Sequence, residues 1–150
     1  MPLLDSLYQL SGVARKRKSD RLQEVARSLT AIESWIEEYA MGGVILENTQ
    51  KTKKTASVLE RGFALVQRLI NRLENNYSEG VMNDTITAVK SLLVLNVDLA
   101  REAGAKMEDF NNTHDLPDLH ELLLEDENIL THKSKEAINA VTRLYKKYPY

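Results

Sequence analysis

The chain has 150 residues, of which 43% are hydrophobic and 28% are charged, and its formal net charge is −2. This balance predicts one folded domain over residues 1–150 and argues against a wholly disordered chain. The absence of cysteine excludes a disulfide framework, thiolate metal ligation and a cysteine nucleophile, and it fits a reducing compartment.

The N-terminal half begins with a short and then a long predicted helix. In residues 1–18, leucines spaced three and four residues apart predict a short amphipathic helix, followed by a basic loop that could move independently of the domain. Ser19 is a suitable N-cap for the first long helix, because apolar residues at helical spacing follow it. That helix is expected to stop at the glycine pair 42–43.

Two further long helices are predicted between residues 45 and 110, a stretch without proline. The first ends near residue 73, before an asparagine pair that tolerates the left-handed conformation of helix ends. Ser78 opens the next helix. The apolar seams are Ala56, Leu59, Phe63, Val66, Ile70 and Leu73 in the first helix, and Met82, Ile86, Val89, Leu93, Asn96, Ala100, Ala103, Met107 and Phe110 in the second.

The C-terminal part predicts two shorter helices. One follows Pro117 and runs to about Glu127, and the last starts near Thr131 or Ser134. No alternation of apolar and polar residues between hairpin turns supports a sheet. The sequence therefore predicts an all-α fold, an antiparallel up-and-down helical bundle of three long helices plus two or three shorter ones.

The stretch 92–99 is apolar on nearly every side, which is typical of a helix that is central in its own fold or that meets a partner. Asn96 falls on the seam of this helix, where a buried amide can fix the register of associating helices. Alternatively, other helices of the same chain bury the stretch, and Asn96 bonds a side chain of a neighbouring helix or is partly wet on a rotated seam. The candidate partner-binding residues are Leu92, Leu95, Asn96 and Leu99.

A basic cluster precedes the first long helix, and such clusters contact nucleic-acid phosphates or act as import signals. A solvated loop, or pairing with the acidic stretch 98–127, explains the same residues. That stretch holds ten acids against two bases and suits a basic partner. The candidate nucleic-acid-binding residues are Arg15, Lys16, Arg17, Lys18 and Arg21, and a basic face could be extended by Lys51, Lys53, Lys54, Arg143, Lys146 and Lys147.

Patterns for catalysis or metal binding are weak. Asp118, His120 and Glu121 bring an imidazole near carboxylates, but the Glu-x-x-His pairs of a diiron bundle are missing. We therefore expect no catalytic residue, no metal ion and no cofactor. No apolar run approaches the roughly 18 residues that span a bilayer, so we also expect no membrane contact and a cytoplasmic or nuclear location.

These observations favour a non-catalytic helical interaction module that binds a protein partner, or a second copy of itself, through a helix face. The long apolar seams and the separated charges support this hypothesis. The alternative is a nucleic-acid-associated accessory protein, such as a packaging, transcription or replication factor, that uses the basic segment 15–21 to contact phosphates.

Overall fold

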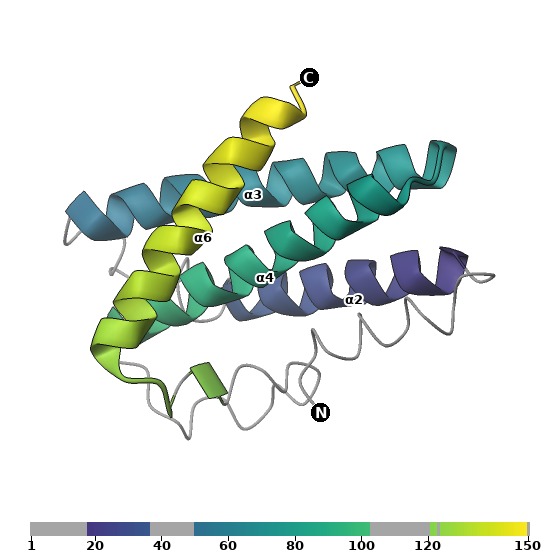
Figure 1. Cartoon of the computed structure of the whole chain (residues 1–150). Helices are drawn as coiled ribbons and strands as arrows, with labels where there is room; N and C mark the ends of the chain where they lie inside the picture. The colour runs from purple at the N-terminus through teal and green to yellow at the C-terminus, as the bar shows by residue number, and fades with distance from the viewer. Residues whose placement is uncertain (1–17, 37–49, 103–120, 123, 150) are drawn as a thin grey trace.

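The computed structural model describes residues 18–36, 50–102, 121–122 and 124–149 (Figure 1). These residues form four helices and no strand: α2 (Lys18–Ile36), α3 (Gln50–Asn75), α4 (Glu79–Glu102) and α6 (Glu127–Lys147). The prediction of an all-α helical bundle is confirmed at this level. The up-and-down order of the whole chain stays a prediction, because the expected N-terminal helix and the segments 37–49 and 103–120 lie outside the described residues.

The turn between α3 and α4 forms where the sequence predicts it. The Asn76 amide donates to the Arg72 carbonyl oxygen at 2.8 Å and closes α3. Ser78 Oγ then accepts from the Val81 amide at 3.4 Å, which satisfies one of the free donors in the first turn of α4. This short turn places α3 and α4 side by side (Figure 1).

The start of α6 differs from the prediction. The helix begins at Glu127, a full turn or more before the expected Thr131 or Ser134. The side chain of Asp126 caps it by accepting from the Asn128 amide at 2.9 Å. An aspartate at this position accepts a hydrogen bond from a free amide of the first turn, and its negative charge is favourable at the positive end of the helix dipole. The cap therefore starts the helix at Glu127, although its first turn is less apolar than the rest.

Helix α4 is the centre of the fold, because α2, α3 and α6 all pack against it. Every residue from 91 to 100 is buried. Its buried hydroxyl groups bond within the helix: Thr85 Oγ1 donates to the Val81 carbonyl oxygen at 2.7 Å, and Ser91 Oγ donates to the Thr87 carbonyl oxygen at 2.8 Å. A helix that is apolar on all sides is thus buried by its own chain.

The buried face of α3 is broader than the predicted seam. In that seam, Leu59, Val66 and Leu73 are buried. The other three residues, Ala56, Phe63 and Ile70, are only partly covered. The buried residues of α3 include Val58, Leu59, Leu65, Val66, Leu69 and Leu73. The face is widened because α3 packs against both α4 and α6.

Gly62 lets the backbone of α3 lie close to the side chain of Leu92 on α4, because a Cβ atom at this position would lie 2.4 Å from Leu92 Cδ2.

Figure 1 shows α6 crossing α3 obliquely, so the C-terminal half of α6 lies over the middle of α3. In the described ranges, each helix is too short or too polar to span a bilayer.

Candidate functional site

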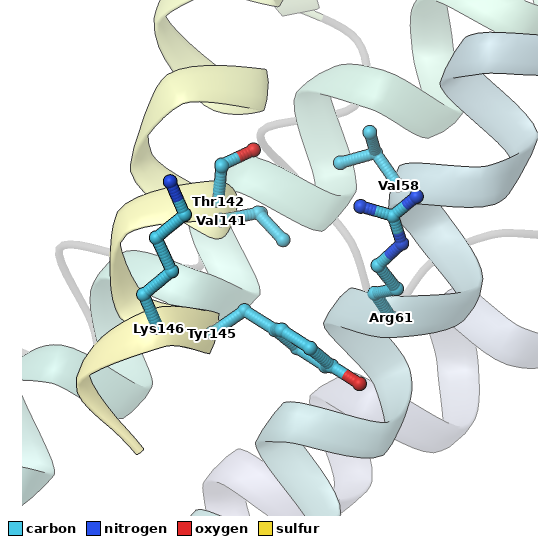
Figure 2. A pocket seen from close by; sticks show the side chains of 6 residues that line it. All are labelled: Val58, Arg61, Val141, Thr142, Tyr145 and Lys146. Atoms are coloured by element: carbon cyan, nitrogen blue, oxygen red, sulfur yellow. The ribbon is translucent and has the colours of Figure 1, made fainter. Parts of the chain in front are cut away.

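A small open pocket of about 70 Å³ lies where α6 crosses α3 (Figure 2). We call it the basic groove. Two buried valines, Val58 and Val141, form its apolar part, and Arg61 and Lys146 stand on opposite sides of it. The lining residues are Val58, Arg61, Val141, Thr142, Tyr145 and Lys146.

Helical spacing brings these residues together. On α3, Val58 and Arg61 are three residues apart and share a face. On α6, residues 141, 142, 145 and 146 are spaced by three and four, so they also lie on one face. The oblique crossing then sets the two faces against each other. The ring of Tyr145 reaches from α6 toward α3 at one end of the groove (Figure 2).

The two cations of the groove have no ion pair with any described residue. Arg61 Nη2 donates only to the hydroxyl of Ser57, at 3.1 Å. Both side chains are exposed, so water screens the repulsion between them. The arrangement can hold a negatively charged group above an apolar floor, and it offers no nucleophile with a neighbouring base.

Aromatic contacts fix the C-terminal half of α6 on α3. The Arg68 guanidinium lies 4.9 Å from the centre of the Tyr145 ring, and the Arg72 guanidinium lies 5.4 Å from that of Tyr148. Cation–π contacts of this kind contribute roughly 0.5–1 kcal/mol at exposed sites. The wall of the basic groove is therefore held in place by α3.

A polar cluster next to the groove joins α6 to α4. Lys147 Nζ and the Tyr148 hydroxyl group both donate to Asp84 Oδ2, at 2.8 and 2.5 Å. Burial raises the pKa of Asp84, but the two hydrogen bonds and the charges of Lys147 and Arg143 outweigh it, so the net pKa is lowered. The hydrogen bond to Asp84 raises the pKa of Lys147, and burial raises the pKa of Tyr148.

The residues predicted to bind a partner lie inside the fold. The side chains of Leu92, Leu95 and Asn96 are fully buried, and Leu99 is 3% exposed. Asn96 Nδ2 donates to the Ile32 carbonyl oxygen at 3.4 Å, so its partner is the backbone of α2 and not the neighbouring side chain expected from the sequence. Other helices of the same chain thus cover this face, and binding of a partner there stays a prediction that would require a helix to move.

The predicted nucleic-acid-binding residues are only partly described. Arg15, Lys16 and Arg17 lie outside the described residues, as does the side chain of Lys18. Arg21 is 2% exposed, and its Nη1 donates to the hydroxyl of Tyr77 and to the carboxylate of Glu79. A side chain buried in this pairing would have to leave it to reach a phosphate, and the role given to Arg21 stays a prediction.

The weak acid–base candidates are not brought together in the described part of the chain. Asp118 and His120 lie outside it, and the side chain of Glu121 is exposed. His132 Nε2 lies 3.1 Å from Glu136 Oε1 on the surface of α6. Among the described residues, no three side chains of histidine, aspartate or glutamate are grouped to hold a metal ion.

Sequence reasoning identified one of the two cations of the basic groove. Lys146 belongs to the basic residues expected to extend a charged face, but Arg61, Thr142 and the two valines were not singled out. Lys53 and Lys54 are exposed on α3, and the side chain of Lys51 lies outside the described part of the chain. No signal in the sequence gives the crossing point of α3 and α6, which alone brings Arg61 to Lys146.

Comparisons with models of protein families, with curated proteins and with solved structures give no match for this chain.

Proposed function

We propose that this protein is a non-catalytic interaction module, built on an antiparallel up-and-down helical bundle, that binds a protein partner through the basic groove. The observation that carries the proposal is the pair of cations, Arg61 and Lys146, that faces across an apolar floor without an ion pair among the described residues. Paired surface charges contribute little to binding, whereas uncompensated ones attract an opposite charge and favour one orientation of a partner.

The floor of the groove defines the second requirement on the partner. Val58 and Val141 are 5% and 1% exposed and belong to the hydrophobic core, so they cannot move away from an incoming side chain. A rigid apolar surface favours an aliphatic side chain, because its burial removes apolar area from water at little conformational cost. The groove therefore suits a peptide segment in which acidic residues flank a leucine or isoleucine.

The groove is less suited to nucleic acid. Sequence-tolerant binding of single strands depends on aromatic faces on which bases stack. The Arg68 guanidinium already lies against the ring of Tyr145 at 4.9 Å. A phosphate contact alone would leave the apolar floor unused, so the combination of charge and floor supports a protein partner.

An NMR titration tests the proposal with three probes: a peptide of alternating glutamate and leucine, the same peptide with glutamine for glutamate, and a short DNA duplex. We expect the acidic peptide to shift the amide signals of Val58, Arg61, Thr142 and Lys146, and the glutamine peptide to bind at least about tenfold more weakly. Amides that stay unmoved by the acidic peptide would overturn the proposal, and so would a duplex that shifts the same amides more strongly.

Matched variants locate the binding surface. Replacing Arg61 and Lys146 together by alanine should abolish the shifts. Replacing Arg27 and Lys90, two exposed cations on α2 and α4, removes the same charge away from the groove and should leave peptide binding within about twofold. Equal losses in the two double variants would mean that net charge, and not the groove, attracts the peptide.

A further inference from the structure

Two large apolar side chains are clearly exposed within the described residues. One lies just before the start of α6 and the other lies in its first turn. Leu124 is 74% exposed and Ile129 is 46% exposed. Acidic residues flank them, and three of these, Glu121, Asp126 and Glu127, are exposed and form no ion pair with a described residue. We call this surface the acidic turn, defined by Glu121, Leu124, Asp126, Glu127 and Ile129.

The acidic turn is held rigidly from inside. Leu122, within this stretch, and Leu130, directly after it, are buried in the core. Arg101 Nη1 donates to the Glu125 carbonyl oxygen at 2.8 Å, and the Glu125 amide donates to the Leu122 carbonyl oxygen at 3.2 Å. These contacts tie the described residues around Leu124 and Ile129 to the fold, which reduces the entropy lost when a partner binds the two side chains.

The acidic turn has the chemistry that the basic groove requires, namely aliphatic side chains next to uncompensated acids. The two surfaces cannot meet within one molecule. Ile129 and Lys146 lie near opposite ends of α6, about 25 Å apart along a helix with a rise of 1.5 Å per residue. Figure 1 shows the two ends of α6 far apart on the fold.

We propose that the partner of the basic groove is a second copy of this chain, whose acidic turn inserts Leu124 between Arg61 and Lys146. This inference rests on the proposed function, and it names the ligand of the same groove. The contact joins two different surfaces, so it is heterologous and can repeat from copy to copy. Because its charged groups are exposed, it weakens as the salt concentration rises.

Light scattering and analytical ultracentrifugation of the full chain, from micromolar to millimolar concentration, test the inference. We expect the average mass to rise with concentration at low salt and to fall at high salt. R61E/K146E should remain monomeric, and so should E121K/E127K. The matched control R27E/K90E makes the same change in charge as the groove variant and should associate like the wild type. Circular dichroism and a urea unfolding midpoint establish that each variant is folded.

Mixing the two monomeric variants gives the decisive result. E121K/E127K keeps a native groove and R61E/K146E keeps a native acidic turn, so an equimolar mixture should associate although neither variant does alone. A wild type that stays monomeric at every concentration would overturn the inference, as would a mixture that does not associate. If the acidic peptide still binds the groove in that case, the proposed function stands and only the identity of the partner is wrong.

Discussion

Helices α2 and α6 both pack against α4, but they differ in how their buried polar groups are satisfied. At the α6 interface, Ser134 Oγ donates to Asp98 Oδ2 at 2.8 Å, and both side chains are buried. A buried carboxyl group thus receives a well-formed hydrogen bond. The short distance and the burial of both partners make this contact stronger than an exposed one.

At the α2 interface, the hydrogen bonding of the buried polar groups is less complete. Asn96 Nδ2 reaches the Ile32 carbonyl oxygen only at 3.4 Å, and Asn96 Oδ1 has no hydrogen-bond partner among the described residues. The same is true of Arg21 Nη2. A buried polar atom without a partner costs about 1–3 kcal/mol. Helix α2 is thus as deeply buried as α6 at its apolar positions and yet is held less firmly.

The largest expected effect comes from shortening one buried leucine at each interface. Leu144→Ala on α6 should lower the free energy of unfolding by about 2–5 kcal/mol and speed hydrogen exchange across α3, α4 and α6. Leu29→Ala on α2 makes the same chemical change and should speed exchange mainly in α2. Hydrogen exchange read by mass spectrometry or NMR checks both variants. An equal and global increase in the two would show that α2 and α6 are held equally firmly.

A smaller effect is expected from the hydrogen bond at the α6 interface. Ser134→Ala removes the donor to Asp98 inside the core and should lower the free energy of unfolding by about 1–3 kcal/mol. Ser28→Ala is the control in α2, because Ser28 Oγ bonds only to the Glu24 carbonyl oxygen of its own helix, at 2.9 Å. The control should change stability by less than about 0.5 kcal/mol in urea unfolding.

The α2 interface should respond in the opposite direction. Asn96→Leu removes the amide oxygen that has no partner in the described part of the chain and replaces it with an apolar group of comparable size. We expect the unfolding free energy to rise by about 1 kcal/mol, with an unchanged slope against urea concentration. A loss of stability would mean that the amide is better satisfied than its 3.4 Å contact indicates.

The smallest effect concerns pH. Asp84 has a lowered pKa in the folded chain, so its contribution to stability is present above its unfolded pKa of 3.8 and is lost as pH falls through the folded value. Asp84→Asn should therefore lower stability near neutral pH by less than about 1 kcal/mol, since the side chain of its partner Lys147 is 59% exposed and water screens the pair. Urea unfolding near neutral pH and at about pH 3 should show the difference between the variant and the wild type shrinking with acid.

Part of the fold follows directly from the sequence. The three-and-four spacing of apolar residues predicts long helices from Ser19 to the glycine pair 42–43, from about 45 to 73 and from 78 to 110. The described helices α2, α3 and α4 lie within or close to these ranges. The asparagine pair and Ser78 locate the turn between the last two. The seam of α3 was only half right, because spacing reports that a stripe exists but not which neighbours widen it. The predicted start of α6 is wrong because Asp126 caps the helix through its side chain, and apolar spacing does not report a polar cap.

The candidate site follows from the sequence to a lesser degree. The excess of bases near residue 146 and of acids before α6 can be read from the chain, since charge is a property of composition. Their meaning depends on tertiary structure. The crossing of α6 over α3 places Arg61 opposite Lys146, and burial of Leu122 and Leu130 turns Leu124 and Ile129 outward. Periodicity fixes which residues share a helix face, whereas only the packing of faces against each other decides which of them remain exposed to a partner.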